Sequence, residues 1–290
     1  MADRKSRTAD QFLARHPELL TEDRTSPRLV RVLAALSAPL SAYFRFRIEG
    51  LERVPAGACL LVGNHSIAAP QEIMLLLRAW HRTMGDRPAR GLVHRIAWQL
   101  PFRLLPLLPG MGGLFAHPEV AQRALARGHA VLVFPGGDVE ALRPFSERYR
   151  VLFEGRIGFA RLARSAGVPI VPVTLCGSHA AFLVLPGARQ LARWTGVERL
   201  WGFKSFPLTG GLVLALVAAA ATLVHPPLWP WLLAALVQMA TPLPTRIEAR
   251  VLAPITVRPD ETDAEAAGRV QAAMQAAMDE LAARRRTPVA

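Results

Sequence analysis

Short apolar runs alternate with helical patterns through much of the chain, and this alternation most limits the folds that are open to it. Apolar strands are predicted at 58–62, 130–134 and 168–175. Helices are predicted between them, at 71–80, 118–127 and 155–165. Strands that alternate with helices indicate parallel pairing, because the chain must cross one face of the sheet before it returns. We therefore expect an α/β fold with a mostly parallel sheet flanked by helices.

The region before the first strand has two parts. Residues 1–25 are predicted to be a flexible or weakly helical arm, and they lack the apolar core of a secretory signal. In 26–47, apolar residues recur with helical spacing and arginines lie near both ends, which predicts an amphipathic helix. Pro39 should bend or interrupt this helix. The helix either packs on the domain or lies in a lipid interface with its arginines on head groups.

The segment 205–245 contains no Asp, Glu, Lys or Arg, and His225 is its only titratable side chain. Two apolar runs, 208–224 and 228–240, are separated by His225 and two prolines. A helix that spans a bilayer needs about 20 apolar residues, so the first run is borderline and the second is short. We predict a membrane-associating helical hairpin that enters one leaflet, or less probably crosses twice. Buried core helices are the alternative.

The α/β core is expected over 48–204, and residues 246–290 are expected to complete it. Residues 246–257 alternate in hydropathy as a final strand would, and 260–286 have the pattern of an amphipathic helix. Cys59 and Cys176 are predicted to be buried residues and not a disulfide or redox pair.

Charge and hydropathy together indicate the partner surface. Lys and Arg number 35 against 22 Asp and Glu, giving a net charge of +13, which suits nucleic acid or an anionic membrane. However, 51% of residues are hydrophobic, only two are Tyr, and no nucleic-acid-binding motif is present. We expect an anionic membrane surface as the partner and no nucleic acid. The oligomeric state is left open.

Two turns carry the residues suited to chemistry. The first holds Asn64, His65 and Ser66, with Glu72 seven residues after the histidine, and the second is 133–138. Both follow strands, and parallel strands place their carboxyl ends at the edge where α/β sites lie. A carboxylate bonded to one imidazole nitrogen leaves the other free to take a proton from an alcohol. The glycine turn offers backbone N–H groups to a phosphate, a glycerol backbone or an oxyanion.

In this order the motifs resemble the PlsC-type glycerolipid acyltransferases, which are 1-acylglycerol-3-phosphate acyltransferase-like enzymes. The resemblance covers about 43–181 and rests on Gly-Asn-His-Ser at 63–66, Val-Phe-Pro-Gly-Gly at 133–137 and Val-Pro-Ile-Val-Pro-Val at 168–173. It implies transfer of a fatty acyl group from acyl-CoA or acyl carrier protein to the hydroxyl of a lysophospholipid or glyceride. It also implies no cofactor beyond that co-substrate, no metal, and a membrane-associated protein. Because the N-terminal residues lack the apolar core of a secretory signal, we expect the catalytic domain on the cytoplasmic face.

The resemblance assigns roles to individual residues. It makes His65 the general base and Glu72 its partner. The substrate-binding candidates are Asn64, Ser66, Phe134, Pro135, Gly136, Gly137, Asp138, Glu140 and Arg143. Weaker candidates are Arg148, Arg150 and Arg156, and an apolar groove for the acyl chain is expected over 98–109.

Three departures from the family pattern bear on function. Glu72 replaces an Asp and stands farther from His65 than in the best-known form of the motif, which leaves open a non-catalytic lipid-binding relative. Gly136 replaces a glutamate, and 112–116 lack the arginine of many phosphate-binding members. These two departures leave a neutral glyceride or another lipid alcohol open as acceptor. A lipid hydrolase is disfavoured because no Gly-X-Ser-X-Gly turn is present, and Ser178 and His179 are predicted to be structural.

Overall fold

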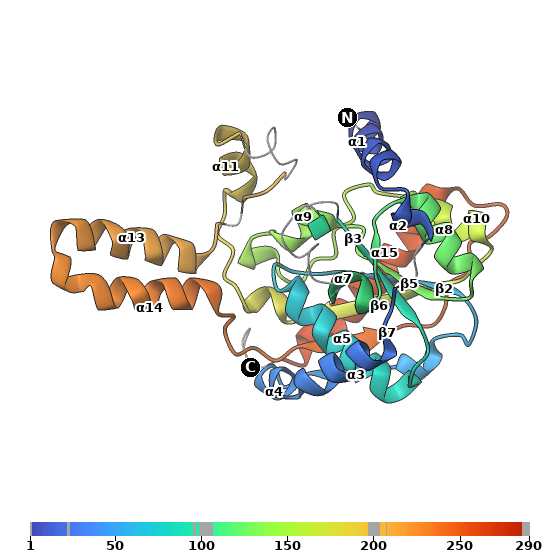
Figure 1. Cartoon of the computed structure of the whole chain (residues 1–290), viewed down its shortest axis with the longest axis horizontal. Coiled ribbons are helices and arrows are strands. Elements are labelled where there is room, and N and C mark those ends of the chain that lie inside the picture. Colours follow the sequence, from blue (N-terminus) through green and yellow to red (C-terminus); the bar gives the residue numbers. More distant parts are fainter. Residues whose placement is uncertain are drawn as a thin grey trace.

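A computed structural model of the chain describes residues 2–21, 24–94, 97–98, 107–196, 204–206 and 208–285. A seven-stranded sheet crosses the body in the order β1–β7–β6–β2–β5–β3–β4 (Figure 1). Its strands are β1 (Arg47–Glu49), β2 (Cys59–Gly63), β3 (Ala89–Val93), β4 (Gly113–Phe115), β5 (Ala130–Val133), β6 (Ile170–Cys176) and β7 (Glu248–Val251). The neighbouring strands run parallel except β6 and β7, which are antiparallel. The predicted α/β class with a mostly parallel sheet is confirmed.

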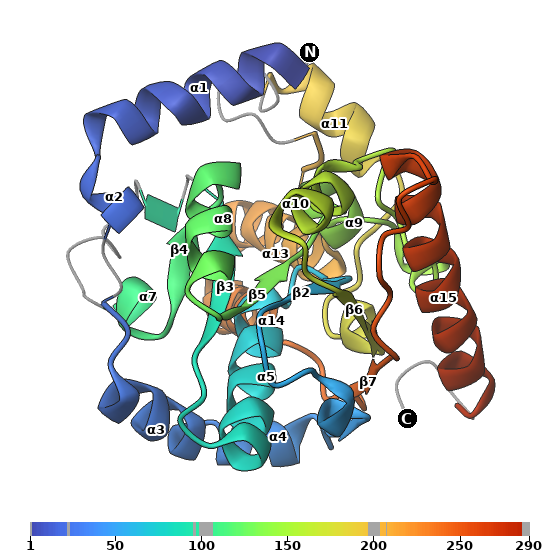
Figure 2. The ribbon, with the colours of Figure 1, turned by 90° about the vertical axis from the view of Figure 1, so that its right-hand side faces the viewer.

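Helices cover both faces of the sheet, as Figure 2 shows. On one face lie α8 (Pro118–Ala126), α10 (Gly158–Ala166) and α15 (Asp263–Ala283), whose apolar residues share a core with β2, β5 and β6. On the other face lies α5 (Ala69–Met84), which packs against the alternate residues of the same strands. Strand β2 is therefore buried along its whole length, which explains its continuous apolar sequence.

The predicted amphipathic helix of 26–47 is broken in two. The structure has α3 (Pro27–Leu36) and α4 (Ala38–Tyr43), which meet at Ser37, so Pro39 lies in the first turn of the second helix. Helix α3 packs on α5, where Arg78 Nη1 donates to the carbonyl of Ala34 at 2.7 Å. Val32 and Leu36 remain exposed on its outer side. The predicted arm contains α1 (Ala2–Arg15) and α2 (Glu18–Thr21), and Leu13 of α1 is buried against Phe115 and Val120.

The uncharged segment forms a pair of helices that projects from the body (Figure 1). Helix α13 (Gly210–Val224) is joined through η5 (Pro226–Leu228) to α14 (Trp229–Ala240), and the two helices pack on each other. Large apolar side chains on both helices face outward, including Leu216, Val217, Leu223, Val224, Trp229 and Trp231. The segment therefore forms a helical hairpin and not a pair of core helices, and its association with a membrane stays a prediction.

No helix in the described ranges combines the length and the apolar character needed to cross a bilayer.

Several elements differ from the sequence-based expectation. The last strand, β7, stops at Val251, and only an isolated bridge between Ile170 and Ile255 continues it past Pro254, which has no N–H to donate. Unpredicted elements are β1, β3, β4, η1 (Leu51–Arg53), α7 (Leu107–Gly110), α9 (Gly137–Ala141), η3 (Phe145–Glu147), η4 (Ser178–Ala180) and α11 (Ala188–Trp194). The groove expected over 98–109 falls largely outside the described residues.

Candidate active site

The two turns singled out in the sequence lie side by side. Strands β2 and β5 pair in parallel with Val62 opposite Val133, so both turns leave the same edge of the sheet. The ring of His65 then stacks on the ring of Phe134, with centroids 4.7 Å apart. Gly63 makes this contact possible, because a Cβ at that position would come within 2.7 Å of the Phe134 ring. The two turns therefore contact each other through the rings of His65 and Phe134, and Gly63 leaves the space for that contact.

His65 presents one edge of its ring to the interior and the other to solvent. Its side chain is 13% exposed, while Nδ1 is buried and makes no hydrogen bond. The nearest carboxylate oxygen is Oε2 of Glu140, 3.6 Å from Nδ1. The remaining edge of the ring is the part that an acceptor hydroxyl could reach.

Glu140 is fully buried on the short helix α9. Its Oε1 accepts hydrogen bonds from the backbone N–H of Leu152 at 3.0 Å and from Arg143 Nη1 at 3.4 Å. Its Oε2 has no hydrogen-bond partner and faces His65. The sequence predicts Glu140 as a substrate contact, whereas the structure places it against the histidine.

Glu72, the predicted partner of His65, contacts Ser66 instead. Its Oε1 accepts from the Ser66 backbone N–H at 3.0 Å and from the Ser66 hydroxyl at 2.8 Å. The loop between His65 and Glu72 does fold back onto the first turn of α5, as a contact between these two residues would require. It places Ser66, and not His65, against the Glu72 carboxylate. Burial raises the pKa of Glu72, and the nearby His65 and Ser66 oppose that rise.

Asn64 and Ser66 also have internal roles in place of the predicted substrate contacts. Both side chains are fully buried. The amide of Asn64 donates to the carbonyl of Leu175 and accepts from its N–H, each at 2.8 Å, as a further residue of β2 would. The hydroxyl of Ser66 donates to Glu72 and accepts from the N–H of Ala68 at 3.0 Å. Because these polar groups are used internally, the two residues hold the turn that presents His65.

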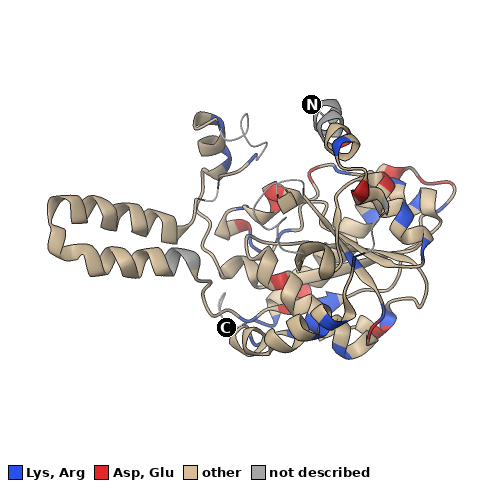
Figure 3. Ribbon diagram, in the orientation of Figure 1, with Lys and Arg blue, Asp and Glu red and all other residues tan. Residues whose placement is uncertain are grey.

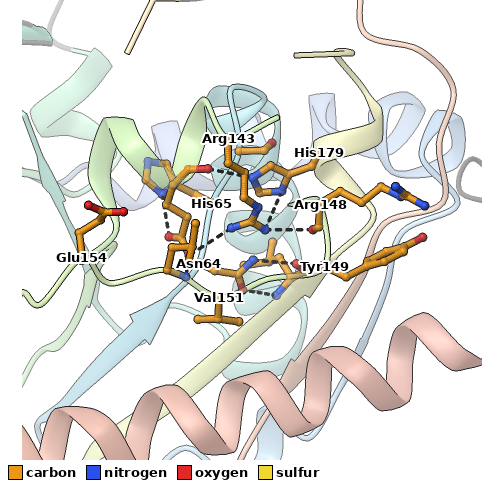
Figure 4. Close-up of polar contacts among 12 residues, drawn as sticks. Asn64, His65, Arg143, Arg148, Tyr149, Val151, Glu154 and His179 are labelled. Carbon is orange, nitrogen blue, oxygen red and sulfur yellow. Dashed lines mark hydrogen bonds and ion pairs between the residues drawn. The ribbon is translucent and has the colours of Figure 1, made fainter. Parts of the chain in front are cut away.

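The sequence predicts Arg143 as an acceptor contact, but the residue is 2% exposed and both of its terminal nitrogens are bonded inside the protein. Its Nη2 donates to the carbonyl of Arg148 at 3.0 Å and to Nδ1 of His179 at 3.2 Å (Figure 4). Burial lowers the pKa of Arg143 to about 10, which leaves the guanidinium charged at neutral pH. His179 lies beside it in the interior, consistent with the structural role predicted for it.

The glycine turn is held by Arg156 and by the segment that leads to the hairpin. Arg156 Nη1 donates to the carbonyl of Pro135 at 2.6 Å, and its Nη2 lies 3.6 Å from Asp138 Oδ1. The other Asp138 oxygen accepts from the backbone N–H of Lys204. Gly137 has a φ of +54°, and a Cβ there would overlap the Arg156 guanidinium. Asp138 and Arg156 therefore pair with protein groups in this structure.

Within the described ranges, no group of three or more His, Cys, Asp or Glu side chains is arranged to hold a metal ion. Cys59 and Cys176 are both free and buried.

Comparison with known proteins agrees with the resemblance noted in the sequence. Residues 45–176 match the model of the acyltransferase family. This segment is therefore similar to the domains of that family. It contains β2, β5 and both turns of the candidate site.

The relatives extend beyond the region that they share with this chain. An uncharacterized protein of Mycobacterium leprae is 34% identical over 176 residues, which are 59% of this chain and 48% of that protein. A mouse protein named "DGAT1/2-independent enzyme synthesizing storage lipids" is 30% identical over 172 residues, 59% of this chain and 50% of that protein. The chain thus spans about half the length of the curated relatives it matches.

The fold also has a solved structural counterpart. The crystal structure of the 1-acyl-sn-glycerophosphate (LPA) acyltransferase PlsC from Thermotoga maritima superposes with a TM-score of 0.54 at 17% identity. The match covers 89% of this chain and 81% of that one. At this identity the likeness concerns the fold.

Proposed function

We propose that the protein is a membrane-associated O-acyltransferase that moves a fatty acyl group from an acyl thioester to a lipid hydroxyl. The observation that carries the proposal is the partly exposed His65 ring at the shared end of β2 and β5, whose Nδ1 is buried toward a carboxylate. This is the arrangement of a general base whose nucleophile comes from the substrate. The acyltransferase family match of the surrounding domain supports the reaction class.

In the proposed reaction His65 moves a single proton twice. Nε2 takes the proton of the acceptor hydroxyl as its oxygen attacks the thioester carbonyl. The tetrahedral intermediate then expels the thiolate of CoA or of the carrier protein, which takes the proton back from the imidazolium. The products are an ester and a free thiol, and no covalent bond to the protein forms. Backbone N–H groups near the Gly136 end of the turn are the proposed donors to the oxyanion.

Of the two acceptor classes, lysophospholipid and glyceride, the local charges favour the neutral glyceride. Among the described residues near the turn, Arg143 is buried, Arg156 pairs with Pro135 and Asp138, and Arg148 stacks on Phe145 and Tyr149. To bind these arginines, the phosphate group of a lysophospholipid would have to displace the protein groups that they already contact. The name of the mouse relative, an enzyme synthesizing storage lipids, is consistent with a neutral acceptor.

The proposed membrane association rests on α13 and α14. The hairpin carries no charged side chain, whereas the body carries both signs over its surface (Figure 3). At 1.5 Å per residue, the 15 residues of α13 extend about 22 Å and the 12 of α14 about 18 Å. One leaflet offers about 15 Å of hydrocarbon, so the hairpin can bury its apolar tip within that leaflet. The catalytic part would then lie on the cytoplasmic face, where acyl thioesters are available.

Acyl transfer by detergent-purified protein tests the proposal. Labelled acyl-CoA and acyl carrier protein are each offered with lysophosphatidate, monoacylglycerol or diacylglycerol, and His65→Ala is assayed beside the wild type. We expect ester product from the wild type, preferentially with a glyceride, and a loss of at least about 10²-fold in His65→Ala. Undiminished activity in His65→Ala would refute the assigned base. Folded wild-type protein that binds lipid but yields no product with any pair would favour the non-catalytic lipid-binding alternative.

A further inference from the structure

Two buried polar atoms face each other without a hydrogen bond in the candidate site. Oε2 of Glu140 and Nδ1 of His65 are both buried, both lack a partner in the described structure, and lie 3.6 Å apart. The other oxygen of Glu140 is already bonded to Leu152 and Arg143. Buried polar atoms in proteins are rarely left unpaired, because that is energetically costly, so such a pair needs an explanation.

We propose that Glu140, and not Glu72, is the positioning residue of His65. Its carboxylate keeps the ring proton on Nδ1 and stabilises the imidazolium that forms when Nε2 accepts the proton of the acceptor. This inference rests on the proposed function and specifies how its base is activated. A separation of 3.6 Å is long for a hydrogen bond, but such contacts in unliganded sites often shorten when charge develops.

Gly136 supports this role by the space it leaves. A Cβ at position 136 would overlap the Glu140 side chain and the carbonyl of Leu152. The φ of Gly136 is −61°, which any residue can adopt, so the backbone itself does not require glycine. The absence of a side chain instead allows the Glu140 carboxylate to lie beneath the turn and reach His65.

Buried groups behind Glu140 hold it in place. Arg143 donates to Glu140, to His179 and to the carbonyl of Arg148, while His179 Nε2 donates to the Glu140 backbone carbonyl at 3.1 Å. The Arg143 guanidinium thus lies directly against the Glu140 carboxylate. Glu72 is a poorer candidate for this role, because its carboxylate is bonded to Ser66 and burial raises its pKa. The titratable groups around His65 are thus Glu140 on α9, Glu72 on α5 and His179 behind Glu140.

Steady-state kinetics of three variants separate the two carboxylates. Glu140→Gln is expected to lower kcat by about 10² or more with little change in KM, because binding of the acceptor does not use Glu140. Glu72→Gln is expected to lose less, through movement of the Ser66 loop. Glu119→Gln, an exposed residue of α8 paired with Arg123, serves as the matched control and should retain wild-type activity. A Glu140→Gln enzyme with kcat within about threefold of wild type would overturn the proposal.

The tautomer of His65 gives a readout that needs no turnover. Nitrogen-15 chemical shifts of the wild-type ring should show the proton on Nδ1, and Glu140→Gln should populate both tautomers. Glu140→Asp keeps the charge and should keep the Nδ1–H form. A wild-type ring protonated on Nε2 would refute the pairing, even if Glu140→Gln fails to fold. Because this measurement is independent of acyl transfer, failure of the proposed function and failure of the pairing can be told apart.

Discussion

His179 remains neutral in the folded protein because of where it lies. It is buried beside the charged Arg143, and both features lower its pKa well below the usual 6.5. Its ring is fixed at both nitrogens, since Nε2–H donates to the Glu140 carbonyl and Nδ1 accepts from Arg143. This histidine therefore links the Glu140 backbone to Arg143. Protonation of its Nδ1 would remove the atom that accepts the hydrogen bond from Arg143.

Acid should therefore destabilise the protein through His179. Below pH 6.5 the unfolded chain binds a proton at this residue that the folded protein does not, so stability falls as the pH falls. The slope is up to about 1.4 kcal/mol per pH unit for one proton. His179→Gln keeps a donor and an acceptor but cannot titrate. Denaturant unfolding from pH 8 to pH 5.5 should show wild type losing stability relative to His179→Gln, and parallel curves would contradict this assignment.

At the residue scale, the sequence indicates which residue stands at the sheet edge but not which carboxylate faces it. His65 could be placed because it directly follows an apolar strand. Glu72 is nearer in the chain, yet the turn places Ser66 against it. Glu140 lies on α9, a five-residue helix too short to show a periodic pattern. Glu72 is close to His65 in the chain and Glu140 is far from it, and only the folded backbone decides which carboxylate faces the histidine.

Among the elements, α15 shows how local sequence fixes a boundary. Thr262 and Glu265 form a reciprocal capping box, in which the Thr262 hydroxyl accepts from the Glu265 N–H at 3.2 Å and the Glu265 carboxylate accepts from the Thr262 N–H at 2.7 Å. The helix then buries Val270, Met274 and Met278 against the sheet. Hydrogen bonds thus fix the residue at which α15 begins, and apolar contacts fix its position on the sheet.

Removing the cap should weaken this helix measurably. Thr262→Ala deletes the hydroxyl that caps the Glu265 N–H, and such losses typically cost about 1 kcal/mol. Thr262→Ser retains the hydroxyl and is the matched control. Equilibrium unfolding in urea should place Thr262→Ala below both wild type and Thr262→Ser. Equal stability of all three proteins would show that packing alone holds the start of α15.

The elements that could be predicted are those whose sequence pattern matches a simple environment. Strands β2, β5 and β6 read as apolar runs because helices cover both faces of the sheet around them. Strands β3 and β4 escaped prediction because β3 contains Arg90 and Gly91, and β4 has only three residues. Short or polar strands of this kind form because they pair with a neighbouring strand. The local sequence pattern contains no information about that pairing.

Across the whole molecule, polarity is divided between two parts. The body carries the charge and the site, whereas the hairpin carries no Asp, Glu, Lys or Arg (Figure 3) and exposes large apolar side chains on both of its helices. The two parts are joined close to the site, since the N–H of Lys204 bonds to Asp138 and the N–H of Phe206 bonds to the carbonyl of Ala188 on α11 at 2.9 Å. Insertion of the hairpin would therefore set the distance of the site from the lipid surface.

Charging the hairpin tip should release the protein from lipid. Leu223 and Val224 are each 87% exposed, so Leu223→Glu with Val224→Glu should leave the fold intact. Each apolar side chain contributes about 1.5–3 kcal/mol on leaving water, so binding to phosphatidylcholine–phosphatidylglycerol vesicles should fall more than tenfold in flotation assays. Gln122→Glu with Ala126→Glu adds the same charge on α8, away from the hairpin, and should bind normally. Equal flotation of both double variants would assign lipid binding to another surface, such as the exposed side of α3.

The strand order of the sheet has a consequence for synthesis. A chain folds as it emerges, N-terminal residues first, and contacts between distant segments must wait for the later one. Strand β2 can pair only after β5 and β6 have been synthesised. Strand β1 can pair only after β7, which follows the hairpin in the chain. The apolar hairpin therefore leaves the ribosome while the edge of the sheet is still open. A bilayer or chaperone at the exit tunnel would meet α13 and α14 before the sheet that carries the site is complete.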